Sequence, residues 1–525
     1  MRASDLPLYY NAADILERNL AERSDKIALY SDGRSVTFGE ISREVNRVGN
    51  ALKKLDVRMG ECVGILAPDS IEWVSCFFGV LKIGAVALGM NTLLKPHDFR
   101  FMLEDARVRV LFIHRDLLGA IEPILPELVH LEHIVVIGSQ MGGSYRRYDE
   151  LIAGESPALD CAKTHREDFG TLNYSSGTTG TPKGIFHSHK DYALTAELWG
   201  LGVLGLRTDD RTFSNAKLFF VYGLGGNLLF PWYVGANAVL HPGSARDAAR
   251  VLRVIDEFKP TVVLNAPTGY AAALAVPGLA DEYDLSSVRL CVSAGEALPP
   301  SIWHEWKEKT GITIIDGIGS TENFHVFISN RPDEVRPGSS GKPVPGYEVR
   351  IVDDDGAPVT IGQVGNLMVK GETAATGYLH EYERSRQTFQ GEWLHTGDKY
   401  YQDADGFFWH AGRSDDMLKV GGIWVSPVEV ESALISHPNV LECAVTGVRD
   451  RSDLVKPKAW VVLTRGIEPS ENLAQALIAH CTQEIAAFKR PRWVQFVDEL
   501  PKTATGKIQR FKLRQLGDGG ADVPS

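Results

Sequence analysis

Cysteine is scarce in this chain and its positions are scattered. The 525 residues include 6 cysteines, and no two of them have the Cys-x-x-Cys spacing that zinc sites and dithiol redox centres use. Isolated thiols in so long a chain indicate a reducing compartment, and we expect the cytoplasm. The cysteines are Cys62, Cys76, Cys161, Cys291, Cys443 and Cys481.

A long uninterrupted apolar run is also missing. The first residues, MRASDLPLYYNAADILERNL, lack the apolar core of a signal peptide. The best candidate for a membrane span, residues 73–90, is interrupted by Ser75, Lys82 and Gly84. We therefore expect a buried helix followed by a strand in this segment, and no association with a membrane.

Excess positive charge is absent, because Lys and Arg number 55 against 67 Asp and Glu, a formal net charge of −12. Such a chain has no general attraction for nucleic acid or anionic lipid. An anionic substrate must therefore meet a local cluster of hydrogen-bond donors.

Strands and helices alternate through the first two thirds of the chain, which is longer than one typical domain. This rhythm predicts parallel sheets in two layered α/β subdomains. A helix is expected from about Ser70 to Lys82. The expected strands lie at residues 62–66, 110–113, 134–137, 262–264, 290–293 and 312–315.

Local signals place several element boundaries. Asp32-Gly33 between apolar runs predicts a hairpin turn. Thr37 and Glu40 have capping-box spacing, and the Ser-Pro-Val-Glu sequence at 426–429 also predicts a helix start.

The pattern of the sequence changes at about Gly338. From there on, short β segments separated by Gly and Asp turns predict a small β subdomain. The Arg-Ser-Asp-Asp stretch at 413–416 predicts a boundary. We therefore predict an N-terminal domain over 1–414 and a mobile α+β C-terminal domain over 415–525.

The stretch 174–184, YSSGTTGTPKG, has the composition of a phosphate-binding loop. Glycines let backbone N–H groups approach an anion, while hydroxyls and Lys183 add donors and charge. It is not a Walker A loop, because Pro182 stands five residues after Gly177 and Ile185 five after Gly180. The alternative is a flexible surface linker, which the Pro-Lys-Gly ending disfavours.

A second candidate loop, DGIGSTE at 316–322, follows the strand expected at 312–315. Loops at the carboxyl ends of parallel strands commonly bind ligands. Glu322 could hold Mg²⁺ between phosphate oxygens. Taken alone, the pattern fits a structural turn equally well.

Five motifs then occur in order: YSSGTTGTPKG, GIGSTE, WLHTGD, GRSDDMLKVGG and PKTATGKIQR. With these motifs, over nearly its whole length, the chain resembles the acyl-adenylate-forming superfamily of acyl-CoA synthetases, peptide-synthetase adenylation domains and luciferases. The stretches AKLFFVYGLG, SAGEALP, GIGSTENFH and GGIWVSPVEVE are most similar to benzoate-type and hydroxybenzoate-type CoA ligases.

The resemblance implies an AMP-forming acid–thiol ligase that uses ATP, Mg²⁺ and CoA. A carboxylate, expected to be benzoate or a hydroxy- or amino-substituted benzoate, attacks the α-phosphate of Mg·ATP to give acyl-AMP and pyrophosphate. The CoA thiol then displaces AMP. The implied ATP and AMP site comprises Ser175, Thr178, Thr179, Gly180, Lys183, Gly295, Glu296, Ala297, Asp316, Gly317, Ile318, Gly319, Ser320, Thr321, Asp398, Arg413 and Lys507.

The resemblance also implies particular catalytic roles. Lys507 is the expected cation between the attacking carboxylate and the α-phosphate, Glu322 the expected Mg²⁺ ligand, and Thr178 a donor to the phosphates. Asp398 could accept from the ribose hydroxyls with help from Arg413. Without the resemblance, a solvated tail lysine and an exposed salt bridge would be the simpler interpretations.

The position of Asp415 resembles the family hinge, about which the C-terminal domain swings between the two half-reactions. Gly421 and Gly422 would then line the pantetheine channel, where glycine leaves a narrow tunnel beside the backbone. A plain hairpin turn at these glycines is the alternative.

The acyl pocket is implied by position-by-position similarity to benzoate-type ligases. Tyr222 and Phe324 offer flat apolar walls for an aromatic ring, and His325 could contact the carboxylate or a ring substituent. Gly269 replaces a larger residue, which would open space for a hydroxyl, an amino group or a larger ring, and Asn323 could hydrogen-bond such a group. The implied pocket is Val221, Tyr222, Gly269, Ala294, Gly319, Asn323, Phe324, His325 and Val326.

Alternative functions remain open at this point. They are a free-standing aryl-acid adenylation enzyme that loads a carrier protein, a cyclohexanecarboxylate or other medium acyl-CoA synthetase, and a non-catalytic nucleotide-binding relative. An α-amino acid is disfavoured, because Phe219, Phe220 and Val221 provide no carboxylate to pair its ammonium. The expected partners are small molecules, with no nucleic acid; a homodimer is considered.

His187 and His189 alternate and would share one face of a strand. No third metal ligand stands nearby in the sequence. We therefore interpret both histidines as structural.

Overall fold

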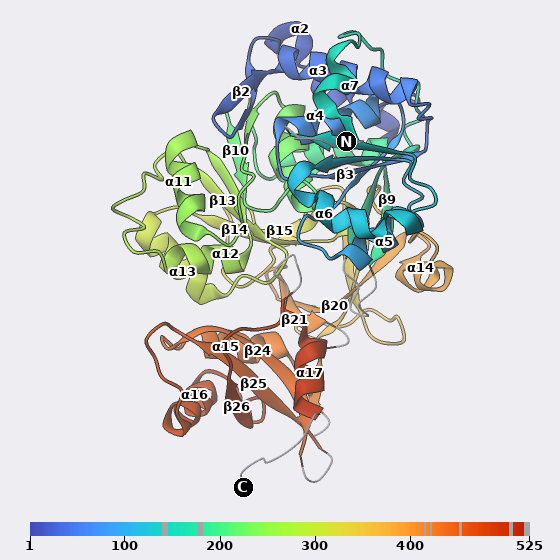
Figure 1. Cartoon of the computed structure of the whole chain (residues 1–525). Helices are drawn as coiled ribbons and strands as arrows, with labels where there is room; N and C mark the ends of the chain where they lie inside the picture. Colours follow the sequence, from blue (N-terminus) through green and yellow to red (C-terminus); the bar gives the residue numbers. More distant parts are fainter. Residues whose placement is uncertain are drawn as a thin grey trace.

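The computed structural model describes residues 1–138, 145–175, 182–413, 416–420, 423–450, 454–502 and 508–518. Over these residues the strands form two large sheets in the N-terminal two thirds of the chain and smaller sheets after them (Figure 1). No helix in this part of the chain has the length and apolarity needed to cross a bilayer.

The first large sheet has seven strands in the order β7-β6-β5-β3-β4-β8-β9. Neighbouring strands are parallel except for the antiparallel pair β8 and β9. The strands are β3 (Cys62–Leu66), β4 (Val86–Gly89), β5 (Val110–His114), β6 (His133–Ile137), β7 (Arg146–Arg147), β8 (Phe169–Ser175) and β9 (Lys183–Ser188).

The second large sheet has nine strands in the order β16-β15-β14-β13-β12-β10-β11-β1-β2. It is parallel from β14 to β1 and antiparallel at both edges. The strands are β1 (Ile27–Ser31), β2 (Arg34–Thr37), β10 (Arg211–Ser214), β11 (Asn237–Leu240), β12 (Val262–Asn265), β13 (Leu290–Ala294), β14 (Ile314–Gly319), β15 (Val326–Ser329) and β16 (Lys342–Pro343).

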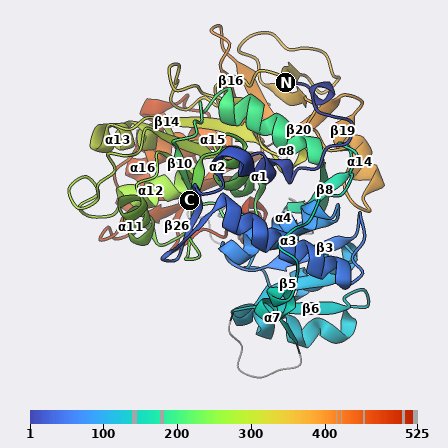
Figure 2. The same ribbon diagram turned by 90° about the horizontal axis from the view of Figure 1, so that it is seen from above.

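Helices between the two sheets build the main hydrophobic core. Figure 2 shows α3, α4 and α8 between β3 and β5 on one side and β10 and β14 on the other, and buried residues of α3, α4, α8, β3, β5 and β14 belong to one cluster. These inner helical segments are α1 (Asp14–Glu17), α2 (Leu20–Arg23), α3 (Phe38–Lys54), α4 (Ile71–Lys82), α7 (Tyr148–Ala153), α8 (His189–Thr195), η4 (Ala196–Leu201), α9 (Val221–Leu224), η5 (Gly225–Leu229) and α10 (Phe230–Tyr233).

The outer faces of the two sheets have their own helices. On the seven-stranded sheet these are α5 (Pro96–Asp105), η2 (Arg115–Leu117), α6 (Leu118–Ile121) and η3 (Glu122–Glu127). On the nine-stranded sheet they are α11 (Ala248–Phe258), α12 (Pro267–Leu274) and α13 (Pro300–Thr310). The remaining short turns are η1 (Ala3–Asp5) and η6 (Thr321–Asn323).

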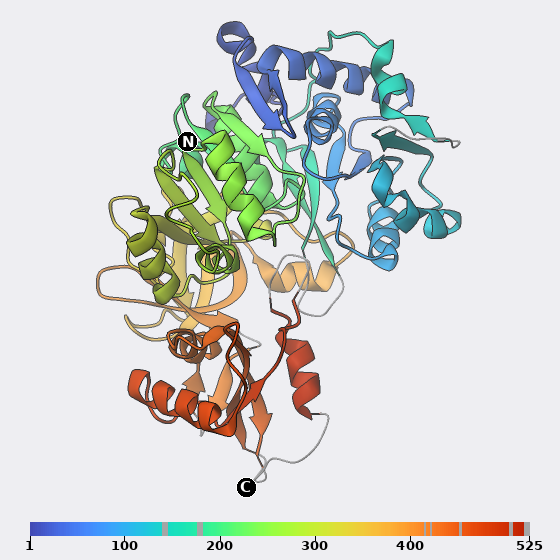
Figure 3. The same ribbon diagram turned by 60° about the vertical axis from the view of Figure 1, so that its left-hand side comes forward.

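A smaller sheet and a C-terminal module complete the fold. The five-stranded sheet contains β17 (Glu348–Val352), β18 (Gly365–Lys370), β19 (Phe389–Gln390), β20 (Trp393–Gln402) and β21 (Phe408–Arg413), with α14 (Tyr382–Thr388) beside it. Figures 1 and 3 show the module below it. The module contains β22 (Leu418–Val420), β23 (Ile423–Val425), α15 (Pro427–Ile435), β24 (Val440–Arg449), β25 (Val455–Leu463), α16 (Glu471–Glu484), β26 (Trp493–Phe496) and α17 (Arg510–Asp518).

The local signals of the sequence are confirmed. Asp32 and Gly33 both have positive φ (47° and 74°) in the turn between β1 and β2. Thr37 and Glu40 form a reciprocal capping box on α3, and the Ser426 side chain caps α15. Residues 73–90, expected to be a buried helix followed by a strand, contain α4 followed by β4 and are mostly buried.

Two expectations about local structure are wrong. The stretch 316–319 is not a loop, because it continues β14 and pairs antiparallel with β15. Glycine makes this pairing possible, since a Cβ at Gly317 would lie 2.7 Å from the carbonyl oxygen of Ile328. His189 does not share a strand with His187, because Ser188 caps α8 and His189 is its first residue.

Candidate active site

A cavity of about 1180 Å³ lies where the N-terminal subdomains, the five-stranded sheet and the C-terminal module meet. Ser175 lies at the carboxyl end of β8 and Asp316 on β14, while Asp398 on β20 and Arg510 on α17 come from the other two parts. The carboxyl ends of parallel strands are the usual position of ligand sites in open α/β sheets.

The structure brings the sequence-predicted nucleotide residues together around this cavity. Those described all line it: Ser175, Lys183, Gly295, Glu296, Ala297, Asp316, Gly317, Ile318, Gly319, Ser320, Thr321, Glu322, Asp398 and Arg413. Seven predicted residues lie outside the described residues, and their roles stay predictions: Thr178, Thr179, Gly180, Asp415, Gly421, Gly422 and Lys507.

Glu322 lies within a compact polar cluster. Its Oε1 accepts a hydrogen bond of 2.8 Å from the phenolic OH of Tyr378, and Lys183 Nζ lies 3.8 Å away. Burial lowers the pKa of Lys183, although the Glu322 carboxylate opposes this shift. Burial and the same carboxylate raise the pKa of Tyr378, which therefore stays a hydrogen-bond donor.

Asp398 and Arg413 are paired across neighbouring strands β20 and β21. Arg413 Nη1 lies 3.1 Å from Asp398 Oδ1, and His410 Nε2 lies 3.8 Å from the same oxygen. The salt bridge of the alternative interpretation is therefore present, but its Asp398 end is buried, and both residues line the cavity.

Asp316 is a buried carboxyl group on β14, and its Oδ2 lies 3.4 Å from the backbone N–H of Leu298. Burial raises the pKa of Asp316 to about 7. Nearby, Gly295 has a φ of +98° directly after β13, a conformation that favours glycine.

Most residues of the expected acyl pocket lie behind the cavity wall. Of that set only Gly319 lines the cavity. The Tyr222 hydroxyl lies 3.3 Å from the carbonyl of Asn265 and 3.2 Å from that of Val292. Ala294 and Val326 are buried, while Val221 is partly exposed.

Two details of the expected pocket are corrected. Phe324 does not present a flat wall, because its backbone turns through a positive φ of 68° and its fully buried ring packs against His187 and Tyr192. Gly269 does not open free space, because a Cβ there would lie 2.0 Å from Asn265 Oδ1.

Unpaired polar atoms gather on two buried residues of the same stretch. His325 Nε2 lies 3.1 Å from the carbonyl oxygen of Tyr222, so this nitrogen donates, and burial lowers the pKa of His325 to about 4. Its Nδ1 is then an acceptor. Neither this atom nor the Asn323 side-chain amide has a hydrogen-bond partner within the described ranges.

Some site residues carried no usable signal in the sequence. Tyr378 is 56 positions from Glu322 and belongs to none of the motifs, so only the fold brings it into contact. The part of the chain that the structure describes contains no cluster of three or more His, Cys, Asp or Glu that could hold a metal ion. Glu322 therefore lines the cavity without belonging to such a cluster among the described residues.

Comparison with known proteins agrees with this arrangement. Residues 16–379 match the AMP-binding enzyme family and residues 429–507 its C-terminal domain. The benzoate–CoA ligase of Thauera aromatica is 46% identical over 516 residues, which cover 98% of this chain and 97% of that protein.

Solved structures extend the similarity to the whole fold. The anthranilate CoA ligase AuaEII, in complex with anthranoyl-AMP, has a TM-score of 0.96 and 62% identity, covering 99% of each chain. A benzoate CoA ligase from Burkholderia xenovorans LB400 has a TM-score of 0.89 and 42% identity, covering 96% of this chain and 100% of that one. From its motifs, its fold and these matches, the chain belongs to the AMP-binding enzyme family.

Proposed function

We propose that this protein is an ATP-dependent aryl-CoA ligase that works through an acyl-AMP intermediate, and that its preferred acid is 2-aminobenzoate. The observation that most supports 2-aminobenzoate is the difference in sequence identity to two aryl-CoA ligases of known structure. The chain is 62% identical to the anthranilate ligase and 42% identical to the Burkholderia benzoate ligase.

The buried stretch after Glu322 supports an amino substituent. Among the described residues, His325 Nδ1 is a hydrogen-bond acceptor without a partner, and the Asn323 amide has an acceptor and a donor without partners, in the layer behind the residues that line the cavity. Buried polar atoms normally have partners, and a ring NH₂ supplies donors that benzoate lacks. An aryl amine is uncharged near neutral pH, so it does not need the carboxylate partner that an α-ammonium group would require.

The residues around the cavity suit the first half-reaction, in which two anions must meet. Lys183 places a positive charge beside the loop expected to hold the β- and γ-phosphates. Asp398 offers an anionic acceptor to the ribose hydroxyls, and its pairing with Arg413 orients it. A local donor cluster also explains how a chain of net charge −12 can bind a polyanion.

Mg²⁺ would arrive with ATP as part of the substrate. A hard oxygen donor is what this ion prefers, and one or two carboxylates together with phosphate oxygens and water are its usual ligands. The Glu322 carboxylate on the cavity wall fits that description. Bound there, the ion would offset negative charge as pyrophosphate departs.

The second half-reaction depends on residues whose roles are carried over from the family. We propose that Lys507 serves the first step only, that the chain hinges at Asp415 between domains 1–414 and 415–525, and that Gly421 and Gly422 then line the path of the CoA thiol. The C-terminal module supports this proposal, because Arg510 and Glu442 from that module line the same cavity as Asp398.

The test is pyrophosphate release with and without CoA, with thioester products identified by mass spectrometry. The panel is benzoate, 2-aminobenzoate, 2-hydroxybenzoate, 2-methylbenzoate, 4-hydroxybenzoate, cyclohexanecarboxylate, cinnamate and a fatty acid. We expect the highest kcat/KM for 2-aminobenzoate, and a lower value for 2-methylbenzoate, which has a similar shape but no donor.

Other outcomes would identify the alternatives. Pyrophosphate release without CoA consumption would indicate loading of a carrier protein, and a preference for cyclohexanecarboxylate would overturn the aromatic assignment. Six free cysteines support a cytoplasmic location. A homodimer stays a prediction, which the mass in solution would test.

A further inference from the structure

The short turn that carries Glu322 is held at three consecutive carbonyl groups. The carbonyl oxygen of Thr321 lies 2.6 Å from His187 Nε2. That of Glu322 accepts from the backbone N–H of Ala375 at 2.8 Å, and that of Asn323 accepts from Thr373 Oγ1 at 3.1 Å. Three external groups therefore fix a turn of three residues.

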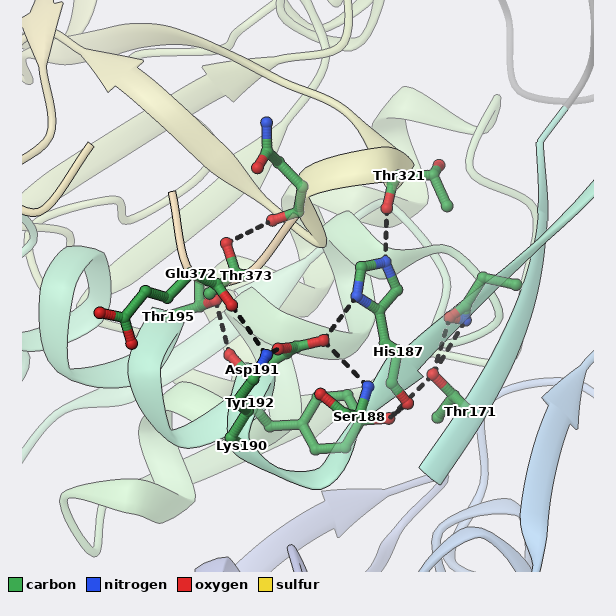
Figure 4. Close-up of polar contacts among 12 residues, drawn as sticks. Thr171, His187, Ser188, Lys190, Asp191, Tyr192, Thr195, Thr321, Glu372 and Thr373 are labelled. Carbon is green, nitrogen blue, oxygen red and sulfur yellow. Dashed lines mark hydrogen bonds and ion pairs between the residues drawn. The ribbon is translucent and has the colours of Figure 1, made fainter. Parts of the chain in front are cut away.

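His187 contacts acceptors with both ring nitrogens (Figure 4). Its Nδ1 lies 3.0 Å from Asp191 Oδ2, and its Nε2 faces the Thr321 carbonyl. A carbonyl oxygen can only accept, and Asp191 also accepts from the N–H of Ser188 and from Lys190. The ring of His187 therefore bridges the Thr321 carbonyl and the Asp191 carboxylate.

The electrostatics of Asp191 agree with this arrangement. Burial alone would raise its pKa, but the hydrogen bond from His187 and the positive charge of Lys190 bring the pKa below its ordinary value. The side chains of His187 and Asp191 are 0% and 3% exposed, so this is a buried charge cluster in which each charge has a partner.

Lys190 extends the cluster to the second support of the turn. Its Nζ donates to Asp191 Oδ1 at 2.7 Å and to the backbone carbonyl of Glu372 at 2.8 Å. Thr373 and Ala375, which hold the other two carbonyls, lie one and three residues after Glu372 in the chain. Figure 4 shows Lys190 between Asp191 and the Glu372–Thr373 backbone. Asp191 is therefore the common anchor of both supports.

We propose that His187, anchored by Asp191, is a positioning residue for Glu322 in the first half-reaction. It does not touch the reacting atoms. Instead, His187 fixes the position of the Thr321 carbonyl. Because Glu322 follows Thr321 in the turn, His187 thereby also fixes the position of the Glu322 carboxylate opposite Lys183 and Tyr378. This inference rests on the proposed role of Glu322 toward Mg·ATP.

The first experiment replaces His187 with Asn, which can donate to only one of the two acceptors. We expect the half-saturating Mg²⁺ concentration for acyl-AMP formation to rise and the rate of that step to fall, each about 10- to 100-fold, the range typical of groups that orient ligands. Thioester formation from supplied acyl-AMP should change less than threefold. Equal loss in both steps would overturn the proposal.

The matched control is His189→Asn, in a buried histidine two positions along the chain. His189 Nδ1 accepts from the backbone N–H of Ala12 and reaches no residue of the Glu322 turn within the described structure. We expect a lower melting temperature with an unchanged Mg²⁺ requirement. A similar shift in Mg²⁺ requirement in both variants would assign His187 a merely structural role.

A double variant separates failure of this inference from failure of the proposed function. If His187 acts through Glu322, the effect of His187→Asn on the Mg²⁺ requirement should disappear in a Glu322→Gln background. A persistent effect there would overturn the positioning role. An unaltered Mg²⁺ requirement in Glu322→Gln alone would instead contradict the proposed role of Glu322.

Discussion

The hydroxyl of Tyr378 donates to the carboxylate of Glu322 at 2.8 Å, so a residue outside every sequence motif orients a residue inside one. The Nζ of Lys183 lies beside both groups, 3.4 Å from the Tyr378 hydroxyl and 3.8 Å from Glu322 Oε1. These three groups define the electrostatics at the end of the cavity where we propose that the phosphates bind.

Glu322→Gln should slow acyl-AMP formation by about 10²–10³, because removing one preorganised charged contact in an active site costs about that much. The isosteric amide keeps the acceptor for Tyr378 but loses the anionic oxygen that Mg²⁺ prefers. Pyrophosphate release at limiting and at saturating Mg²⁺ is the measurement. Wild-type rates at limiting Mg²⁺ would refute this assignment.

Gly269→Ala should destabilise the protein by about 1–3 kcal/mol, because the new methyl group collides with the Asn265 side chain. That side chain accepts from Asn215 and from the N–H of Ala266, so it cannot move without losing both bonds. This prediction differs from the sequence-based expectation that Gly269 opens space in the acyl pocket.

Asn265→Ala provides the control for this prediction. Removing the Asn265 amide should relieve the collision, so the double variant should lose less stability than the two single changes together. Free energies of unfolding in urea test this. Simple additivity would show that the collision is relieved elsewhere.

Asp316→Asn should stabilise the ligand-free protein at alkaline pH and much less at acid pH. Burial raises the pKa of Asp316 to about 7, so the wild type loses stability as the pH rises from about 4 through 7, while the amide does not titrate. A shift from 3.8 to about 7 corresponds to a difference of at most ~4 kcal/mol. Urea denaturation from pH 5 to 9 measures it, and a difference independent of pH would contradict the prediction.

Lys507→Ala should abolish formation of acyl-AMP from acid and ATP, yet largely spare thioester formation from supplied acyl-AMP. Only the first step brings two anions together and needs a cation between them, a contact worth about 10²–10³ in rate. Asp415→Pro should show the reverse pattern, because proline fixes φ and stiffens the proposed hinge. Single-turnover kinetics would distinguish the two, and parallel loss of both steps in both variants would leave the swinging domain unsupported.

Local chemistry made much of the fold predictable. The hairpin at Asp32-Gly33, the capping box of Thr37 and Glu40 and the cap at Ser426 depend on neighbours within a few residues. Because all the residues that form these features are close together in the sequence, the features can be predicted from it directly. The motif residues also converge on one cavity, because the ends of parallel strands meet at one edge of a sheet.

The wrong expectations involve contacts between distant segments. The sequence after Asp316 predicts a loop, but in the structure this stretch is a strand because it pairs with β15. The sequence predicts Phe324 as a wall of the acyl pocket, but in the structure its backbone has a positive φ and its ring packs against His187. His187 and Thr321 are 134 positions apart, so no local pattern could reveal that one holds the other.

Strand β9 carries both Lys183 and His187, and their spacing limits the changes in length that this strand can tolerate. Residues four apart in a strand point to the same face and stand about 13 Å apart. These two side chains contact the same turn at two places: Lys183 lies beside the Glu322 carboxylate, and His187 contacts the Thr321 carbonyl. One inserted residue between Gly184 and Phe186 would turn one of the two side chains to the opposite face. The segment should therefore accept changes of residue type far more readily than any change of length.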